Sequence, residues 1–335
     1  MLVDRFGRTA TDLRVSVTDK CDLRCTYCMP AEGLPWLPRA EILTDDEIVR
    51  LVRIAVEQLG IREVRLTGGE PLIRPGLPGL IARLTALEPR PRLSLTTNGV
   101  ALARLAGPLA EAGLDRVNVS LDTLDPALFR TLTRRDRHER VIAGIDAALA
   151  VGLGPVKINT VLMRGINEHE AAALLRWSLA RGCELRFIEQ MPLDAQHGWD
   201  REKMVTAEEI LEQLSAEFDL APEGAQVRGT APAETWRVEG HSAPDGRPAR
   251  VGVIASVTRP FCGDCDRVRL TADGQMRTCL FAREESDLRT PLRDGASDEE
   301  LAERWRIAFL GKKAGAGIGE PNFVQPGRPM SAIGG

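Results

Sequence analysis

The segment LRVSVTDKCDLRCTYCMP (13–30) joins an apolar, strand-like run to three closely spaced cysteines. Within 13–18 the apolar residues alternate with polar ones, which is the period of a half-buried β-strand. Cys21, Cys25 and Cys28 follow with the spacing C-x3-C-x2-C. Three thiolates on one short loop can bind three irons of a cubane cluster and leave the fourth iron open, whereas a closed structural site takes four ligands. The segment therefore predicts a strand that ends in a metal-binding loop.

Strand-like and helix-like patterns then alternate along the chain. An amphipathic stretch at 45–60 has Thr44 and Glu47 at capping-box spacing and ends at Gly60, a typical helix terminator. Further helix-like stretches lie at 107–113 and 168–182. Repeated strand–helix units predict a parallel sheet, and six units are too few for a closed eight-stranded barrel. The predicted fold class is α/β, a partial (βα)6 TIM-like barrel, with strands at 13–18, 63–67, 92–97, 116–122, 156–162 and 184–190.

The carboxyl ends of these predicted strands are polar. In α/β barrels the catalytic groups gather at this edge. Ordinary turn and cap residues are the alternative explanation for about half of them individually. They do not explain why the first cysteine group begins on the same edge. The polar ends are Thr18-Asp19, Thr67-Gly68-Gly69-Glu70, Thr96-Thr97-Asn98, Ser120-Leu121-Asp122, Asn159 and Glu189.

The pattern changes after about residue 198. A helix is predicted at 206–218, strands at 235–240 and 250–256, and a second helix at 298–310. Asp273-Gly274 joins two strand-like runs as a hairpin turn. The Gly/Pro-rich stretch 312–335 is predicted to lack regular structure. We therefore predict two domains, the barrel at 1–198 and a smaller α+β domain at 199–335 that closes the barrel mouth.

Composition excludes several classes of protein. The net charge of −4 over 335 residues gives no general attraction to nucleic acid or anionic membranes. No apolar run approaches the roughly 18–20 residues of a membrane span, and the opening MLVDRFGRTATDLRV lacks the apolar stretch of a signal peptide. A cytoplasmic protein is expected, in which seven cysteines favour metal or redox chemistry over disulfides.

A second cysteine group, Cys262-x2-Cys265-x13-Cys279, repeats the count of three. Two separate three-thiol groups suggest two metal centres that each keep one position for a ligand. Arg267 and Arg269 alternate on a predicted strand and would face the same side, where they could bind an anion. Solvated strand charges are the alternative.

Zinc is the other metal to consider. A zinc ribbon completed by Cys183 remains possible at the second group, although Cys183 is more simply a buried small apolar residue. At the first group no fourth ligand is evident nearby. The histidines are all remote from Cys28 in sequence: His138, His169, His197 and His241.

The loop CDLRCTYCMP (21–30) resembles the cluster loop of radical S-adenosylmethionine (SAM) enzymes, in which an aromatic residue, here Tyr27, precedes the third cysteine. Gly68-Gly69-Glu70-Pro71 matches the GGEP motif of that superfamily. The glycines would let the backbone approach the ligand closely. The resemblance implies that SAM chelates the open iron and that one electron cleaves it to methionine and a 5′-deoxyadenosyl radical.

The segment FCGDCDRVRLTADGQMRTCLF (261–281) resembles the molybdenum cofactor biosynthesis protein A (GTP 3′,8-cyclase) family. The resemblance runs end to end and includes FGRTATDLRVSVTDKC, MPAEGLPWLPR, RFIEQMPLD and the final Gly334-Gly335. Gln190 departs from the family, where an aromatic residue is common. The resemblance implies two [4Fe–4S] clusters facing each other across the barrel mouth, the second of which binds the GTP base. The radical takes hydrogen from C3′, which then bonds to C8 to give 3′,8-cyclo-GTP.

The same resemblance implies roles for individual residues and partners. A terminal Gly-Gly inserts into the active site in this family, and Arg186 is a further substrate-side group. The partners implied are an electron donor and the downstream cyclic pyranopterin monophosphate synthase, with a monomer or homodimer as the assembly. SAM contacts would be Tyr27, Gly69, Ser120 and Met191; GTP contacts Arg14, Arg65, Thr96, Lys157, Arg267, Val268 and Arg269; catalytic residues Arg186, Gly334 and Gly335.

Alternatives remain at this point. Arg14, Arg65 and Lys157 would present charge inward to a triphosphate, but outward-facing charges paired with carboxylates also fit such positions. A peptide-modifying radical SAM maturase with an auxiliary cluster is a rival, although such enzymes usually carry more C-terminal cysteines. A zinc-binding structural or nucleic-acid module is a rival of another class, and the acidic net charge disfavours it.

Overall fold

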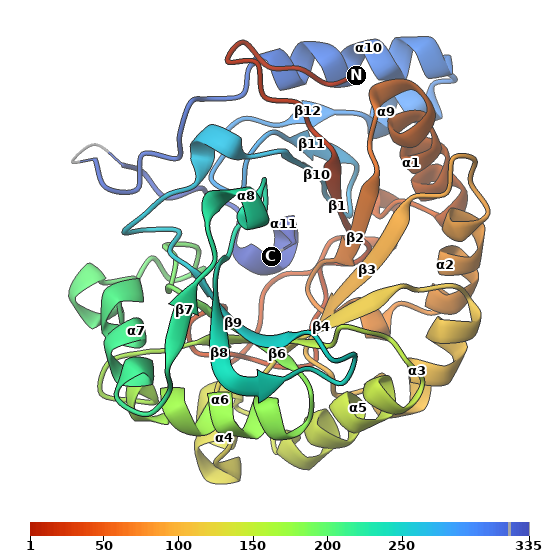
Figure 1. Ribbon diagram of the computed structural model, residues 1–335. Coiled ribbons are helices and arrows are strands. Elements are labelled where there is room, and N and C mark those ends of the chain that lie inside the picture. The colour runs from red at the N-terminus through yellow and green to blue at the C-terminus, as the bar shows by residue number, and fades with distance from the viewer. Residues whose placement is uncertain (321–322, 335) are drawn as a thin grey trace.

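A ring of strands surrounded by helices forms the body of the protein (Figure 1). The computed structural model describes residues 1–320 and 323–334. Six consecutive parallel strands form the predicted partial barrel, so the α/β fold class is confirmed. Each strand has one face on the lumen and one on the helices. The strands are β1 (Asp12–Ser16), β2 (Glu63–Thr67), β3 (Arg92–Thr97), β4 (Arg116–Ser120), β5 (Lys157–Val161) and β6 (Glu184–Ile188).

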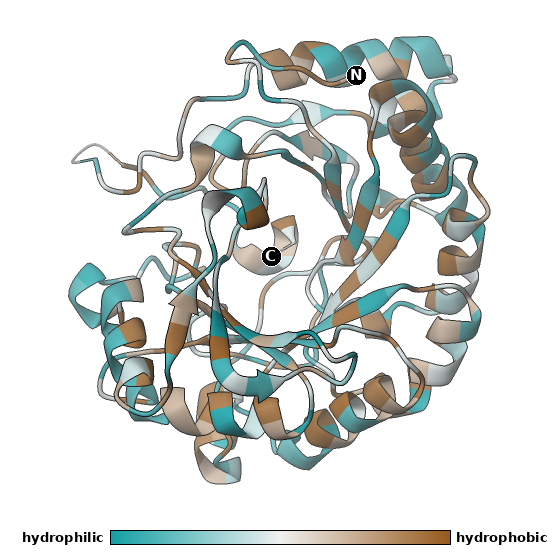
Figure 2. Cartoon of the chain, viewed as in Figure 1, coloured by the Kyte–Doolittle hydropathy of each residue, from teal (hydrophilic) through white to brown (hydrophobic). Residues whose placement is uncertain are grey.

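Helices cover the outside of these strands, and apolar and polar residues alternate along both layers (Figure 2). α1 begins at the capping box of Thr44 and Glu47 and ends at Gly60, whose φ of 84° is left-handed, as predicted. Among the helices of residues 1–320 and 323–334, none combines the length and apolar character needed to cross a membrane. The outer helices are α1 (Asp45–Leu59), α2 (Leu77–Thr85), α3 (Leu102–Glu111), α4 (Pro126–Thr133), α5 (His138–Ala150) and α6 (Ala171–Ala180).

The rest of the chain extends the same sheet at both edges. β10 lies parallel to β1, and β9 lies parallel to β6. The remaining strands pair antiparallel beyond them, in the order β12-β11-β10-β1 at one edge and β6-β9-β8-β7 at the other. The division near residue 198 stays a prediction. The strands are β7 (Leu220–Pro222), β8 (Glu234–Ser242), β9 (Pro248–Ile254), β10 (Arg267–Leu270), β11 (Gln275–Arg277) and β12 (Ser286–Asp287).

The remaining helices include one that the sequence did not suggest. The stretch 312–335 was predicted to be irregular, but α11 forms a short helix in the centre of the ring (Figure 1). Pro329 precedes it with an extended backbone and so begins the turn. The C-terminal segment therefore enters the lumen. The helices are α7 (Ala207–Ser215), α8 (Ala225–Arg228), α9 (Arg289–Arg293), α10 (Asp298–Leu310) and α11 (Met330–Ile333).

Candidate functional site

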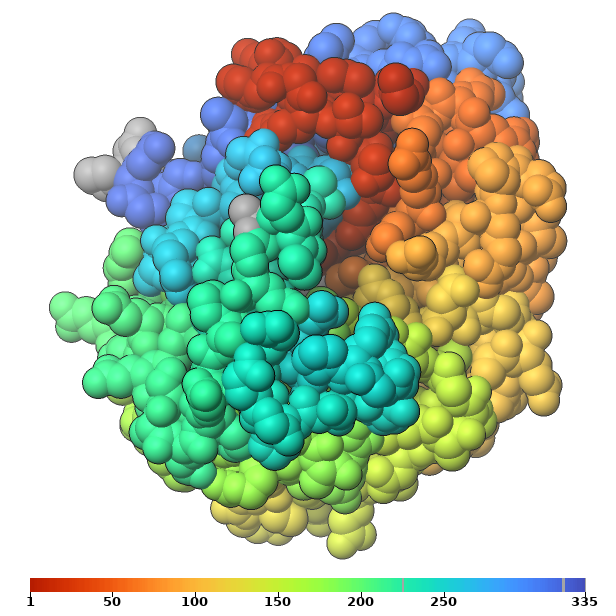
Figure 3. All heavy atoms as spheres, in the orientation of Figure 1, coloured from red at the N-terminus to blue at the C-terminus, as the bar shows by residue number. Residues whose placement is uncertain are grey.

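A cavity of about 340 Å³ lies inside the barrel. Figure 3 shows the surface hollowed at the centre of the ring. Both cysteine groups line this cavity, together with polar side chains from the strands between them. The structure thus brings the two groups, which are far apart in sequence, into one chamber. The cavity cysteines are Cys21, Cys25, Cys28, Cys262, Cys265 and Cys279.

The two cysteine groups approach the cavity from opposite ends of the barrel. Cys21 follows the carboxyl end of β1, whereas Cys265 precedes the amino end of β10. These two strands are parallel, with Asp12 beside Arg267, so their amino ends lie on the same edge. Cys279 follows β11, which runs antiparallel to β10, and so joins Cys265 at that edge. The two groups of three thiols therefore lie at opposite ends of the lumen, and we call these ends the two three-thiol ends.

The first cysteine loop has a fixed backbone. The amides of Cys28 and Met29 both donate to the carbonyl of Cys25, at 2.9 and 3.0 Å. Arg134, at the end of α4, donates to the carbonyls of Arg24 and Met29, at 2.9 and 3.0 Å. The loop is therefore held from inside and from the neighbouring helix, which keeps its thiols directed at the cavity.

The glycine pair after β2 brings this loop against the strand. A Cβ on Gly68 would lie 2.2 Å from the carbonyl oxygen of Thr18, and one on Gly69 would lie 2.2 Å from that of Lys20. The amide of Gly69 donates to Thr18 at 2.9 Å. We predicted that these glycines make room for a ligand. Both line the cavity, but the contacts that require glycine are with the chain leading into the first cysteine loop.

A buried carboxylate supports the aromatic residue of the first loop. The Tyr27 hydroxyl donates to Asp122 at 2.7 Å, and the amide of Val161 donates to the other oxygen at 2.9 Å. Burial raises the pKa of Asp122 to about 6, against these hydrogen bonds. Asp122 lines the cavity with Tyr27, Ser120 and Met191. The sequence identified Asp122 only as a polar residue at a strand end. Its position beside Tyr27 could be recognised only in the folded structure.

Two cations support the second cysteine group. Arg8 donates to the carbonyl of Cys262 at 2.7 Å. The Lys312 ammonium lies 2.9 Å from the carbonyls of Cys265 and Arg267 and 3.4 Å from the Cys265 sulfur. Burial alone would raise the pKa of Cys265, but the Arg267 and Lys312 charges outweigh it and lower that pKa to about 7. Sequence reasoning missed Arg8 and Lys312, because no local pattern marks a partner so distant along the chain.

Each donor set consists of three thiols, which is the ligand number of a cubane cluster with one open iron. Among residues 1–320 and 323–334, no group of three or more His, Cys, Asp or Glu side chains is placed to hold a metal ion. Ligands of one ion converge on one point, whereas cubane cysteines each bind a different iron and stay further apart. Cys183 is buried in the core and does not line the cavity, so it does not complete a zinc ribbon there.

Three arginines on adjacent strands form a row across the lumen, which we call the arginine row. Arg14 of β1 is in register with Arg269 of β10 on one side and with Arg65 of β2 on the other. All three line the cavity. Burial, and then the charges of Arg65 and Arg269, hold the pKa of Arg14 well below its usual range, and its Nε has no hydrogen-bond partner. Adjacent buried like charges are unfavourable unless an anion joins them.

Of the other predicted substrate residues, some line the cavity and others do not. Arg186 and Thr96 line the cavity. Lys157 does not; it pairs at 2.9 Å with Glu184, which also pairs with Arg186 at 3.0 Å. Burial, with the Arg186 charge, lowers the pKa of Lys157 to about 8. The carboxylate-paired alternative thus describes Lys157, and its contact with Glu184, which also pairs with Arg186, links it to the lumen.

The β10 segment directs alternate residues to opposite sides. Arg267 lines the cavity, and its guanidinium lies 4.9 Å from the centre of the Phe261 ring. Val268, between the two arginines, is fully buried in the core and does not line the cavity. Any contact of Val268 with a ligand would therefore involve its backbone.

The C-terminal segment reaches the arginine row. Arg269 donates to the carbonyl of Gly334, whose φ is 73°. A Cβ on Gly334 would lie 2.4 Å from Ser16 Oγ and 2.6 Å from Thr67 Cγ2, so only glycine fits between β1 and β2. Gly335 lies outside the described residues. The structure thus places one of the two predicted terminal glycines in the lumen.

Family models match most of the chain. Residues 15–178 match the Radical SAM superfamily, and residues 183–318 match Molybdenum Cofactor Synthesis C. Among solved structures, SuiB of Streptococcus suis covers 90% of this chain and 67% of its own, with a TM-score of 0.60 and 16% identity. Its complex with S-adenosylmethionine gives a TM-score of 0.57 over 88% of this chain and 68% of its own, also at 16% identity. These likenesses show the fold.

Curated relatives match over the whole chain. A GTP 3′,8-cyclase of Streptomyces coelicolor is 66% identical over 335 residues, which cover 100% of this chain and 96% of that protein. A GTP 3′,8-cyclase of Corynebacterium glutamicum is 57% identical, covering 100% of this chain and 89% of that protein. This chain belongs to the GTP 3′,8-cyclase family within the radical SAM superfamily.

Proposed function

We propose that the protein is a GTP 3′,8-cyclase, a lyase that converts GTP to 3′,8-cyclo-GTP in the first step of molybdenum cofactor biosynthesis. One observation carries the proposal: a single cavity joins two three-thiol ends through a buried arginine row. Such a chamber suits a polyanion whose far end meets one metal centre while its reacting carbon faces the other. The family membership supports the same reaction.

The first end would bind SAM. Cys21, Cys25 and Cys28 would hold a [4Fe–4S] cluster which, with SAM bound, supplies one electron that cleaves SAM and so provides the radical that takes a hydrogen atom. Tyr27, Gly69, Ser120 and Met191 line this end and would contact SAM. Asp122 orients the Tyr27 ring through its hydrogen bond. The loop is pinned to α4, so these groups need little rearrangement on binding.

The middle and second end would bind GTP. The arginine row, with Arg186, Arg267 and Thr96, would hold the triphosphate, whose charge offsets the repulsion among buried guanidinium groups. Lys157 would contact GTP from its position beside Glu184, and Val268 would contact GTP through its backbone. A second [4Fe–4S] cluster on Cys262, Cys265 and Cys279 would bind the guanine base. Substrate held at both ends would keep C3′ and C8 in a fixed relation.

The C-terminal segment would complete the chamber. Met330 and Ser331 line the cavity, and Gly334 contacts Arg269. With Gly335, this segment would exclude water and hold the reacting sugar, a role that needs residues without bulk. We also keep the division near residue 198 as part of the proposal. Its support is a change of pattern, since the sheet itself continues across that point.

Partners and location follow from the reaction. SAM cleavage consumes an electron, so an electron donor must meet the protein. The product would pass to cyclic pyranopterin monophosphate synthase. We propose a cytoplasmic enzyme, acting as a monomer or homodimer, that binds neither nucleic acid nor membranes. The acidic net charge of −4 supports the absence of general nucleic-acid binding.

Anaerobic turnover with GTP, SAM and dithionite tests the function. The expected product has the mass of GTP, because the hydrogen atom taken from C3′ is replaced by an electron from the reductant and a proton from water. 5′-Deoxyadenosine should form alongside it. Cys21→Ala should form neither compound, and Cys265→Ala should still cleave SAM without making the product. SAM cleavage that leaves GTP intact in the unaltered protein would refute the proposal and favour another radical SAM reaction.

A further inference from the structure

The C-terminal tail (residues 323–334) carries one charged side chain. Across residues 321–335, PNFVQPGRPMSAIGG, the only ionisable side chain is that of Arg328. Its neighbours Gly327 and Pro329 contribute no polar side chain. The other contacts of the tail involve amide groups or backbone: Gln325 donates to the Asp194 carbonyl at 2.6 Å, the Met330 amide donates to the Leu193 carbonyl at 3.2 Å, and the Gly334 carbonyl accepts from Arg269. Arg328 is therefore the one side chain of residues 321–335 that can form an ion pair.

Arg328 makes a two-point ion pair with a buried carboxylate. Its two terminal nitrogens lie 2.9 and 2.5 Å from the two oxygens of Asp273, and its Nε lies 3.2 Å from Glu285. Asp273 is only 5% exposed. Burial would raise the pKa of Asp273, but hydrogen bonds from Arg328 and Thr271 hold it below its usual value. We call these three residues, Arg328, Asp273 and Glu285, the tail anchor.

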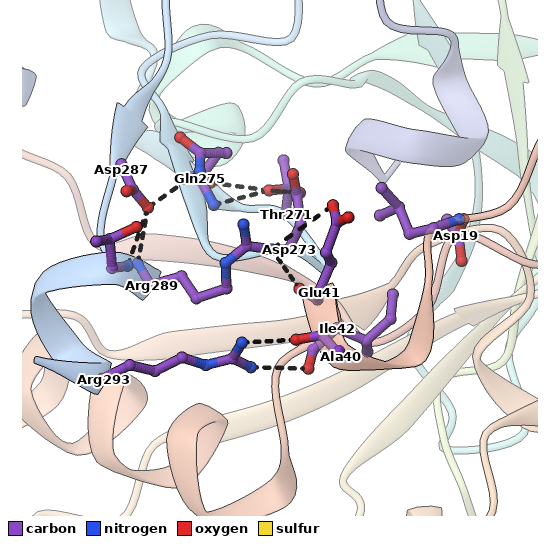
Figure 4. Close-up of polar contacts among 12 residues, drawn as sticks. Asp19, Ala40, Glu41, Ile42, Thr271, Asp273, Gln275, Asp287, Arg289 and Arg293 are labelled. Carbon is purple, nitrogen blue, oxygen red and sulfur yellow. Dashed lines mark hydrogen bonds and ion pairs between the residues drawn. The ribbon is translucent and has the colours of Figure 1, made fainter.

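The turn that carries Asp273 is rigid. Thr271 Oγ1 donates to Asp273 at 2.6 Å, and the Leu288 amide donates to the Gly274 carbonyl at 3.0 Å. A Cβ on Gly274 would lie 2.7 Å from Arg289 Cβ, so the turn is packed closely against α9. Figure 4 shows Thr271, Gln275, Asp287 and Arg289 joined by hydrogen bonds around this turn. The tail anchor thus has a fixed base.

The same hairpin carries the substrate-side arginines. β10 holds Arg267 and Arg269 and leads directly into the turn of Asp273. The tail leaves Arg328, forms α11 and returns to Arg269 through the Gly334 carbonyl. The tail is therefore attached at the turn through Arg328 and at the arginine row through Gly334, and both attachment points lie on one rigid element.

We propose that Arg328 is a positioning residue: through Asp273 and Glu285 it sets where the tail enters the lumen, and so seats Gly334 beside Arg269. The effect of Arg328 on catalysis rests on the proposed function. The position of the tail can be measured without turnover, so an experiment can refute this inference without refuting the proposed function, and the reverse.

The first test is kinetic. Arg328→Gln should lower kcat for cyclisation about tenfold, as expected when a partly buried charge loses its two-point partner, and leave the KM for SAM unchanged. The ratio of 5′-deoxyadenosine to cyclised product should rise, because SAM cleavage does not need the tail. Arg328→Lys should restore part of the rate, since it keeps the charge but not the two-point geometry. Arg293→Gln removes an Arg–Glu47 pair of similar geometry between α9 and α1 and should match the unaltered enzyme.

The second test is amide hydrogen exchange of residues 323–334 without GTP. Arg328→Gln and Asp273→Asn should each accelerate exchange in α11, and the double variant should exchange no faster than either single one. If Asp273→Asn fails to fold, Arg328→Gln and Arg328→Lys still decide the matter. Unaltered exchange and an unaltered product ratio in Arg328→Gln would overturn the inference. Absence of product in the unaltered protein would instead overturn the proposed function, and the exchange result would still stand.

Discussion

Arg14 is the residue whose surroundings indicate the ligand most clearly. It lies between Arg65 and Arg269, is buried, and has an Nε without a partner. Asp12 is the nearby carboxylate, 4.0 Å from Arg65. One carboxylate does not balance three guanidinium groups, so this group of residues carries excess positive charge. A triphosphate bound there, as proposed, would supply the missing negative charge.

Lys157 gives this view a measurable consequence. Burial and the Arg186 charge lower the pKa of Lys157 to about 8. A triphosphate nearby favours the protonated form and raises that pKa, so GTP binding at pH 8 should take up about half a proton per chain. Titration calorimetry of the reconstituted protein in buffers of different ionisation enthalpy measures this uptake.

Variants identify the source of that proton. Lys157→Met should abolish the proton uptake and weaken GTP binding about tenfold. Lys203→Met is the control, because Lys203 is exposed and does not line the cavity. Equal proton uptake in Lys157→Met and the unaltered protein would show that this lysine does not sense the substrate.

Gly334 and Gly327 form a matched pair within the tail. Gly334→Ala should prevent seating of the tail, because the new Cβ meets Ser16 and Thr67 and the φ of 73° is strained for alanine. Product formation should fall at least about a hundredfold while SAM cleavage continues. Gly327→Ala meets nothing within 4 Å and should have little effect. Chromatographic separation of the product from GTP, which has the same mass, checks both variants, and equal activity of the two would contradict the account.

At the scale of elements, local sequence patterns predicted the strands, caps and turns that short-range interactions determine. The six barrel strands, the capping box of α1 and the hairpin at Asp273-Gly274 all follow from short-range periodicity and turn chemistry. The helix α11 did not, because four residues between prolines and glycines show no helical period. Nor did the pairing of β10 with β1, since register between distant strands leaves no local signal.

Lys312 connects two such distant elements and should matter for one cluster only. Lys312→Met removes the hydrogen bonds that the ammonium group donates to the carbonyls of Cys265 and Arg267. We expect iron per chain to fall from about eight to about four after reconstitution, with the first cluster retained. Iron analysis and electron paramagnetic resonance measure this loss.

Lys313→Met is the control for that variant. Lys313 is the exposed neighbour, and only its backbone carbonyl contacts Arg8. Its variant should keep the full iron content. Retention of both clusters in Lys312→Met would show that the ammonium group is not needed to hold the second cluster.

At the scale of the molecule, the arrangement of the two cysteine groups is the main feature. Their spacing was enough to predict two centres with open positions. That the two groups face each other was implied only by the family resemblance, and no local pattern predicts their placement at opposite ends of one lumen, because it depends on β10 running parallel to β1. The roles of Arg8, Lys312 and Asp122 were also missed, since each acts through a contact made only in the folded chain.

The central claim is that this lumen holds GTP with its C3′ atom at the first cysteine end. Transfer of deuterium from GTP labelled at C3′ tests it most directly, with GTP labelled at C8 as the control. The account predicts 5′-deoxyadenosine carrying deuterium from the C3′ label and none from the C8 label. Unlabelled 5′-deoxyadenosine formed together with cyclised product from C3′-labelled GTP would contradict it.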